Sequence, residues 1–189
     1  EGPKTIEDFF DTEKFPGKRG LRKRPQVNME WALLADGVAP EEVYEVLATE
    51  EGQAQAFAKL DTIKDEITWY DSWSQAPVLL NDGGATMVQS ANGRIFAAIK
   101  DDGAPFEIVW DSHIYDLDVW AIMKGTEKKE EAMEFIKFAT GTVPLSGMQD
   151  VAYGPTRASA QALLPEEVKK DLPTAHLDEG VKADGIFWA

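Results

Sequence analysis

The segment from Asp111 to Asp118 carries the side chains best suited to binding chemistry, because carboxylates and aromatic rings alternate along it. Tyr115 is followed at once by Asp116, and Asp118 comes two residues later. An aromatic face beside a carboxylate binds an organic ammonium ion through cation–π contact and charge pairing. The segment therefore predicts a recognition site for an amine.

The rest of the sequence does not indicate a catalytic site. The two histidines, His113 and His176, stand in unrelated contexts, and neither belongs to an HExxH zinc motif or a nucleophile elbow. No GxxxxGK[ST] phosphate loop occurs, and the lack of cysteine excludes thiolate catalysis, disulfides and Cys-ligated zinc. Adjacent carboxylates such as Asp101 and Asp102 arise by chance among 34 acidic residues. We therefore predict no enzyme, no metal site and no cofactor, and keep an enzyme acting on an amine as the less favoured alternative.

A second group of polar residues is predicted at the ends of secondary-structure elements. Residues 85–88 carry no charge and follow two glycines, which is typical of a short strand buried on both faces. Asn92-Gly93 then predicts a turn. Open α/β sheets bind ligands beyond the carboxyl ends of such strands, although an ordinary strand and turn would show the same pattern. The ligand-binding residues predicted on these grounds are Asn92 and Arg94, together with Ser74 and Gln75 at the start of a predicted helix.

Charge and composition exclude several classes of partner. The 189 residues include 34 acidic and 19 basic side chains, which gives a formal net charge of −15. A field of that sign repels a phosphate backbone, so nucleic acid is not expected as a partner. With 43% hydrophobic residues the chain can bury a sizeable core. No stretch approaches the roughly 20 apolar residues of a membrane-spanning helix.

Hydrophobic periodicity predicts helices that alternate with strands, and this alternation defines the α/β class. Helices are expected at residues 5–10, 28–35, 49–67, 127–139, 157–164 and 165–172, with a further short helix from residue 40. Strands are expected at residues 85–88, 106–110 and 118–123. The basic cluster at residues 18–24 is expected to be a solvated edge strand, protected from further pairing by its charges.

Several stretches, in order along the chain, resemble one family. They are FFDTEKFPGKRGL, MEWALLADGV, PEEVYEV, FAKLDTIKDEITWYDSWSQAPVLLNDGGATMVQSANGR, DVWAIMKGTEKKEEAMEFIKFAT and AYGPT. This succession is similar to the spermidine/putrescine-type solute-binding proteins of ABC importers, and it covers essentially the whole chain. The resemblance implies a periplasmic-binding-protein-like fold of type II, mainly one lobe with a mixed sheet flanked by helices. It also implies a protein that binds a polyamine-like amine without catalysis.

The resemblance further implies a division of the chain and a set of partners. Residues 1–117 would form the second, C-terminal lobe, residues 118–156 would cross the hinge to complete the first lobe, and residues 157–189 would return to the second. A preceding N-terminal lobe of about a hundred residues is expected to be missing. We therefore expect a periplasmic protein that delivers its ligand to a membrane permease. A ligand-sensing receptor module of the same fold is the alternative.

Individual site residues follow from the resemblance position by position. Asp118 matches the family's carboxylate that pairs with a ligand ammonium, and Tyr153 matches an aromatic residue that lines the cleft. The sequence departs from polyamine binders at Asp116 and Ala91, where the family carries aromatic residues. Arg24 stands near the position of an expected acidic pair, so an anionic ligand stays open as an alternative.

The predicted helix at residues 127–139 leads to one further expectation. Its apolar face carries Phe135, Ile136 and Phe138 and would pack on the missing lobe in such proteins. If this face stays exposed, it can be covered by a second copy of the chain. We therefore expect the chain by itself to form a homodimer and to bind small ligands weakly.

Overall fold

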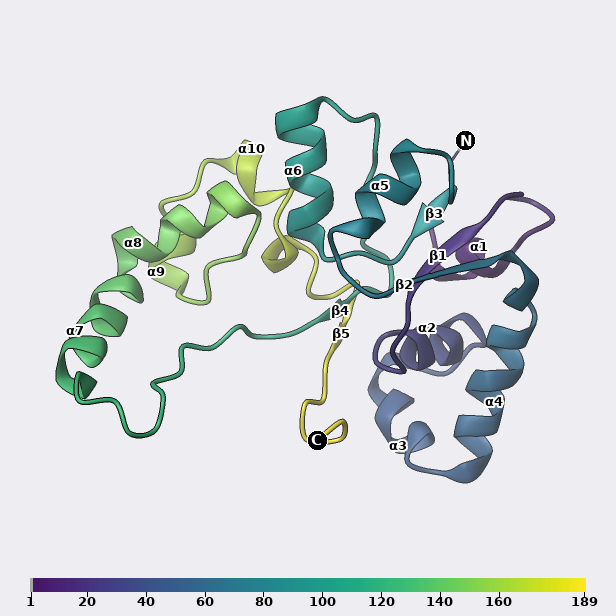
Figure 1. Cartoon of the computed structure of the whole chain (residues 1–189), viewed down its shortest axis with the longest axis horizontal. Helices are drawn as coiled ribbons and strands as arrows, with labels where there is room; N and C mark the ends of the chain where they lie inside the picture. The colour runs from purple at the N-terminus through teal and green to yellow at the C-terminus, as the bar shows by residue number, and fades with distance from the viewer. Residues whose placement is uncertain (1) are drawn as a thin grey trace. The chain divides into compact units, whose positions relative to one another are not determined.

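A three-stranded parallel sheet organises residues 2–115 in the computed structural model, which describes residues 2–189 (Figure 1). Its strands are β1 (Arg19–Arg22), β2 (Ile67–Tyr70) and β3 (Met87–Val88), in the order β2-β1-β3. β1 pairs in parallel with both neighbours, so that Arg22 lies opposite Tyr70 and Gly20 opposite Val88. The α/β class is confirmed, although the strand pairs of the described residues are all parallel and the expected mixed sheet is not observed.

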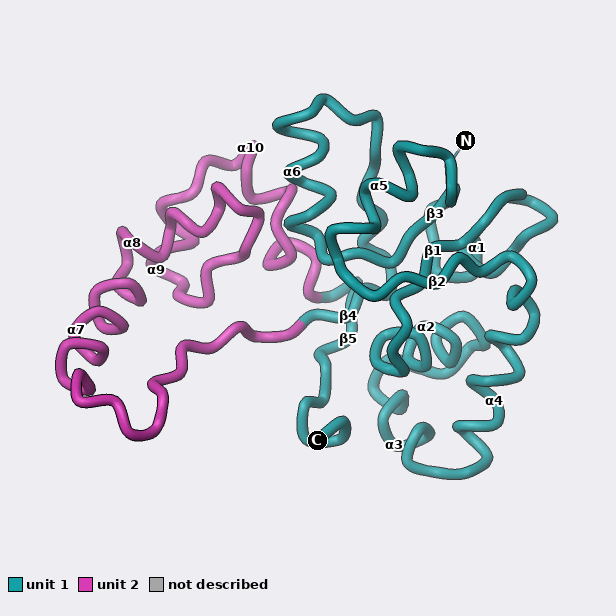
Figure 2. Tube along the Cα trace, in the orientation of Figure 1, with its two compact units in different colours: residues 1–115, 178–189 teal, residues 116–177 magenta. Residues whose placement is uncertain are grey.

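The chain divides into two units, which Figure 2 shows in different colours. Unit 1 comprises Glu1–Tyr115 and Asp178–Ala189, and unit 2 comprises Asp116–Leu177. A second parallel pair, β4 (Ile114–Tyr115) with β5 (Val181–Lys182), joins the two parts of unit 1. Across residues 2–189, no helix has the length and apolarity that crossing a membrane requires.

β1 is the central strand of the sheet, and the prediction of a solvated edge strand for the basic cluster is wrong. Arg19 is fully buried. Its guanidinium donates hydrogen bonds to four backbone carbonyl oxygens, those of Phe9 at 2.7 Å, Gly17 at 2.6 Å, Phe15 at 2.6 Å and Asp11 at 3.1 Å. Burial lowers the pKa of Arg19, and nearby carboxylates oppose that shift. The charge can therefore occupy the interior because carbonyl dipoles replace its water shell.

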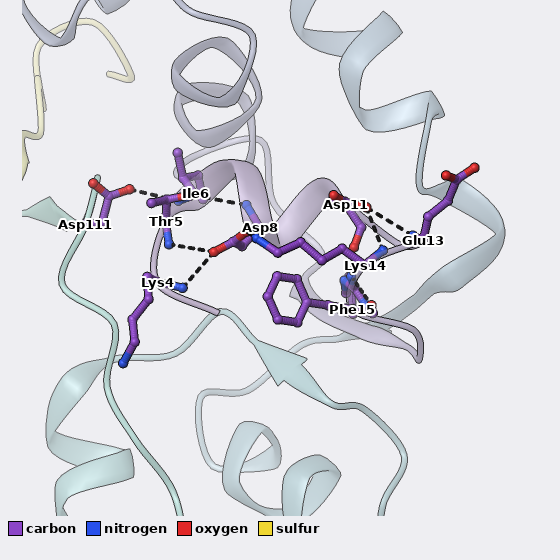
Figure 3. Close-up of polar contacts among 10 residues, drawn as sticks. Lys4, Thr5, Ile6, Asp8, Asp11, Glu13, Lys14, Phe15 and Asp111 are labelled. Carbon is purple, nitrogen blue, oxygen red and sulfur yellow. Dashed lines mark hydrogen bonds and ion pairs between the residues drawn. The ribbon is translucent and has the colours of Figure 1, made fainter. Parts of the chain in front are cut away.

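The first helix, α1 (Ile6–Phe10), is held at its N-terminus by side chains close to it and far from it in sequence (Figure 3). Thr5 Oγ1 accepts from the Asp8 N–H at 3.3 Å, and Asp8 Oδ2 accepts from the Thr5 N–H at 3.4 Å, which forms a capping box. Asp111 Oδ2 accepts from the Ile6 N–H at 2.8 Å. The carboxylate of Asp111 therefore anchors the segment 104–113 to the start of α1.

The other helices of unit 1 supply most of its hydrophobic core. They are α2 (Asn28–Ala35), α3 (Val43–Leu47), α4 (Glu50–Asp61), α5 (Gln75–Asn81) and α6 (Asn92–Asp102), with the 3-10 helices η1 (Pro40–Glu42) and η2 (Lys64–Glu66). In Figure 1, α2, α3 and α4 pack together, and α5 lies beside α6. Leu33, Val43 and Leu47 are among the fully buried side chains of this core.

Several predicted element boundaries in unit 1 are wrong. The helix expected at residues 49–67 ends at Asp61, and the residues after η2 form strand β2. Asn92-Gly93 begins helix α6 and does not form a turn, because Ile95 and Ala98 of α6 are buried against the rest of the unit. Residues 106–110 lie outside helix and strand, as do residues 118–123 of unit 2.

Unit 2 contains one longer helix, α7 (Lys129–Ala139), followed by several short ones. The short ones are α8 (Thr142–Ser146), η3 (Gly147–Val151), α9 (Ala158–Gln161), α10 (Glu166–Lys169) and η4 (Pro173–Ala175). Large apolar side chains are exposed along α7 and near it, with Phe135 at 55% and Phe138 at 67% of their full area. This is the face from which a homodimer is predicted, and the pairing itself stays a prediction.

Candidate ligand-binding site

Three strand-to-helix turns meet at the carboxyl edge of the parallel sheet in unit 1. Residues 23–27 connect β1 to α2, residues 71–74 connect β2 to α5, and residues 89–91 connect β3 to α6. The Lys23 N–H donates to the Tyr70 carbonyl oxygen and the Gln89 N–H to that of Gly20, both at 2.8 Å, so the strand ends stay together. This edge is where open α/β sheets bind their ligands.

A buried polar network joins the three strand ends. Gln89 accepts through Oε1 from the Arg22 N–H at 3.1 Å and donates through Nε2 to Asn28 Oδ1 at 2.8 Å. Asn28 donates through Nδ2 to the carbonyl oxygens of Arg22 and Arg24, at 2.8 Å each. The Tyr70 hydroxyl donates to the Gln89 carbonyl oxygen. Gln89 is 1% exposed and Asn28 3% exposed, so these bonds are shielded from water.

Tyr70 keeps its role in this network over the whole physiological pH range. Burial raises the pKa of Tyr70 well above its ordinary value, and the nearby Arg22 charge opposes that shift only in part. A hydroxyl that stays protonated remains a donor to Gln89. The network therefore holds the ends of β2 and β3 together without a protonation switch.

The segment between β1 and α2 contains a strained residue. Val27 has φ 71°, in a region that β-branched residues rarely adopt. It directly precedes Asn28, whose side-chain amide accepts one hydrogen bond through Oδ1 and donates two through Nδ2. Strain of this kind persists where surrounding contacts fix the backbone, and it concentrates at functional segments.

The Arg22 guanidinium is held in place beside this segment. Its Nε donates to the Asp71 carbonyl oxygen at 3.1 Å, and its carbon lies 4.4 Å from the centroid of the Trp73 ring. A cation–π contact and one hydrogen bond restrain the guanidinium. Arginine binds a carboxylate through two parallel N–H groups, and the terminal nitrogens of Arg22 can serve in that way.

Four cationic side chains lie at this edge, and none has an ion-pair partner among residues 2–189. They are Arg22, Lys23 and Arg24, at and after the end of β1, and Arg94 in the first turn of α6. Lys23, Arg24 and Arg94 are exposed. The three turns at this edge contain one carboxylate, that of Asp71, so in a chain with 34 acidic residues the four cations still reverse the local sign of charge. The arrangement suits an anionic group of a ligand.

The structure brings five of the nine predicted ligand residues to this edge. Gln75 begins α5, and its Oε1 accepts from the N–H groups of Asp71 at 3.0 Å and Ser72 at 2.8 Å. Ser74 Oγ lies 2.9 Å from Ser72 Oγ in the same turn. The N-cap of α6 provides no side-chain acceptor for its first N–H groups. The five residues are Arg24, Ser74, Gln75, Asn92 and Arg94.

The other four predicted residues do not belong to the three turns at this edge. Tyr115 belongs to β4, where its carbonyl oxygen accepts from the Ala183 N–H at 2.8 Å. Asp116, Asp118 and Tyr153 belong to unit 2 and are exposed. Their part in ligand binding stays a prediction. Among residues 2–189, no cluster of His, Asp and Glu side chains is arranged to hold a metal ion.

Sequence reasoning missed the residues that support the edge. Asn28 and Gln89 are 61 residues apart, so no local pattern indicates that they are bonded. Arg22 belongs to the basic cluster at residues 18–24, which was expected to be solvated. One signal was available: Gln89 follows a buried strand directly, at a position where a polar side chain needs partners inside the protein.

Comparisons with known proteins place this fold in a group of binding proteins. The family described as bacterial extracellular solute-binding protein matches residues 1–174. The gamma-aminobutyric acid-binding protein of Pseudomonas aeruginosa is 44% identical over 189 residues, which cover 98% of this chain and 53% of that protein.

Two solved structures, each 33% identical in sequence, have similar folds. One is a GABA receptor, with a TM-score of 0.81 over 100% of this chain and 57% of that chain. The other is the periplasmic binding protein MotA from A. tumefaciens B6 in complex with glucopine, with a TM-score of 0.85 over 99% of this chain and 59% of that chain. The chain thus spans little more than half the length of these relatives, and the predicted periplasmic-binding-protein-like fold is confirmed. It belongs to the bacterial extracellular solute-binding protein family.

Proposed function

We propose that this chain belongs to the solute-binding component of an ABC importer and that its ligand carries both a carboxylate and an amine. The observation that carries the proposal is the set of four cationic side chains without ion-pair partners at the carboxyl edge of the sheet, Arg22, Lys23, Arg24 and Arg94. The proposed setting is the periplasm, and the proposed partner is a membrane permease that receives the ligand.

The chemistry of the edge favours a carboxylate as the group that is bound there. The restrained Arg22 guanidinium can bind a carboxylate by donating two parallel N–H···O hydrogen bonds. α6 is 11 residues long, and its N-terminus adds the positive potential of a helix dipole on the same side. Backbone donors and arginine together are a common arrangement for holding an anionic group.

The relatives support the class of ligand without deciding it. One is named for gamma-aminobutyric acid, which has an acid at one end and an amine at the other. The polyamine-like ligand predicted from sequence is the alternative, and the sheet edge argues against it. A polyamine carries only ammonium groups, which four neighbouring cations would repel.

Binding measurements on the full-length protein test the proposal. Calorimetry with gamma-aminobutyric acid, putrescine and spermidine should give heat of binding only with the first. Arg22→Ala should weaken that binding by roughly 30-fold or more, which corresponds to the about 2 kcal/mol or more lost when one partner of a buried charge pair is removed. Arg24→Ala should weaken it less, because Arg24 is exposed. The matched control is Lys18→Ala, at the other end of β1, where the lysine is exposed and paired with Glu66 at 3.1 Å.

Other outcomes of these experiments would contradict the proposal. If putrescine or spermidine binds, and Asp118→Asn weakens that binding while Arg24→Ala leaves it unchanged or strengthens it, the ligand is a cation. Turnover of a candidate amine by the purified protein would favour the enzyme alternative. Binding of gamma-aminobutyric acid that Arg22→Ala and Arg24→Ala do not alter would show that the sheet edge is not the ligand site.

A further inference from the structure

We propose that Gln89 and Asn28 are positioning residues, which set the affinity for ligand without touching it. This inference rests on the proposed function, because it takes the cations after β1 as ligand-binding groups. Both side chains are almost completely buried, and neither faces solvent where a ligand could reach it. Their bonds end on the backbone of Arg22 and Arg24, the two arginines that the proposed function uses.

The two amides form a directional pair in which every polar atom is used. Gln89 offers its oxygen to the Arg22 N–H and its nitrogen to Asn28 Oδ1, and Asn28 offers its nitrogen to two carbonyl oxygens. Rotating either amide by a half turn would place oxygen against oxygen or nitrogen against nitrogen. The arrangement therefore requires a side chain at position 89 that accepts from the Arg22 N–H and donates to Asn28 Oδ1.

The backbone that receives these bonds has few other restraints. The sheet ladder ends with the Lys23 N–H bond to Tyr70, and residues 23–25 are exposed. Beyond that point, the Arg24 N–H donates to the Arg22 carbonyl oxygen at 2.7 Å, and Asn28 Nδ2 is the side-chain group that donates to the Arg22 and Arg24 carbonyl oxygens. The strained Val27 lies between Arg24 and Asn28, so loss of the network would let this segment relax. The arginine side chains would then sample more positions, and the affinity for a carboxylate would fall.

The first test separates positioning from stability in the full-length protein. Gln89→Met and Asn28→Leu keep side-chain volume and remove the hydrogen bonds, and each should weaken binding of gamma-aminobutyric acid at least tenfold. The control is Tyr44→Phe, which removes a partly buried hydrogen bond from Tyr44 to Glu30 Oε1 in the same unit and touches none of the bonds that Gln89 and Asn28 make. It should lower the unfolding midpoint and leave the dissociation constant unchanged, with all affinities measured at a temperature where each variant is folded.

The second test measures how the affinity of a variant depends on pH. A purely structural role of Gln89 would not produce the same pH dependence. In Gln89→Glu the introduced carboxylate can accept from the Arg22 N–H, but it opposes Asn28 Oδ1 when ionised. When protonated, it has the donor and acceptor pattern of the native amide. Burial raises the pKa of such a carboxyl, while the Arg22 charge lowers it. Tyr70, the other titratable group bonded to Gln89, stays protonated in this range.

We therefore expect the affinity of Gln89→Glu to recover as the pH falls from 8 to 5, while the wild type stays constant. The ligand itself does not change charge in that window, because its acid and amine titrate near about 4 and 10. The inference is overturned if Gln89→Met and Asn28→Leu bind like Tyr44→Phe, or if the Gln89→Glu profile is as flat as that of the wild type. If the wild type binds no carboxylate ligand, or binds one that Arg22→Ala does not weaken, the proposed function has failed instead. Should Asn28→Leu not fold, the Gln89→Glu profile decides the question alone.

Discussion

Replacing Arg19 with methionine should remove a large part of the stability of unit 1, because the native guanidinium supplies donors to four backbone carbonyl groups. The Phe9 oxygen is in a buried contact, and the oxygens of Asp11, Phe15 and Gly17 lie in partly buried ones. Methionine fills a similar volume and donates nothing. The carbonyl groups would be left without their native partner in the folded state.

The magnitude follows from how many of these carbonyl groups water can reach. A hydrogen bond to a charged group contributes about 1.5–3 kcal/mol, so four would give an upper limit of roughly 6–12 kcal/mol. Asp11 and Gly17 are exposed and can turn to solvent, and the contact with the Phe15 oxygen is only partly buried, so the Phe9 oxygen is the one acceptor in a buried contact. We therefore expect a loss of about 3–5 kcal/mol, above the about 1–3 kcal/mol of one unsatisfied buried acceptor and below the upper limit for four.

Urea unfolding followed by circular dichroism measures this loss. Arg19→Lys should be intermediate, at about 2 kcal/mol, because an ammonium keeps the charge but cannot reach four acceptors with a planar fork. Lys18→Met is the matched control, since its exposed ion pair with Glu66 is worth about 0–1 kcal/mol. A loss below about 1 kcal/mol for Arg19→Met would refute the reasoning, because the loss of hydrogen bonds to four carbonyl groups should lower the free energy of unfolding by more than that.

Two further predictions concern the first helix and the exposed face of unit 2. The pKa of Asp8 is lowered mainly by its hydrogen bond with Lys14, so its contribution to stability is present above the ordinary carboxyl pKa and is lost as the pH falls through the lowered value. Acid unfolding curves should therefore show a smaller loss below about pH 4 for Asp8→Asn than for the wild type. If the apolar side of α7 pairs two copies of the chain, Phe138→Glu should shift the mass in light scattering toward the monomer. Lys137→Glu, on the exposed polar side of the same helix, should not, and equal masses for all three proteins would contradict the pairing.

Local signals in the sequence were sufficient to locate several helices. Thr5 begins α1 through a side-chain cap, and the apolar spacing in residues 28–35 matches α2. Both features act within one or two turns of a helix, so they need no knowledge of the rest of the fold. The carboxyl end of β3 was also predicted as a ligand edge, because a short uncharged strand followed by polar residues is a local pattern.

Features that depend on distant contacts could not be predicted in this way. Arg19 looked like a surface residue because its partners are backbone carbonyl groups, which every residue carries, and only the folded path of the chain turns four of them toward it. β2 was absorbed into a predicted helix, since Ile63 and Ile67 continue the apolar spacing of α4 although the chain turns at η2. Asn92-Gly93 favours a turn in isolation, and burial of the α6 face overrides that preference.

The net charge of the chain is negative and the local charge at its sheet edge is positive. Together these two charges determine which ligand charge the proposed site prefers. The net charge of −15 favours approach of a cationic group, but at physiological salt this field is screened over about 8 Å. At contact distance the local charges decide, and at the sheet edge these are cationic. A simple anion is disfavoured by the overall field, and a polyamine is disfavoured by the edge. A ligand with a carboxylate and an amine satisfies both conditions if its carboxylate meets Arg22 and its amine points away from the sheet. Because such a ligand carries no net charge, the long-range field does not steer it. Raising the salt concentration should therefore change its association rate little, whereas a ligand with a net positive or negative charge would associate at a clearly salt-dependent rate.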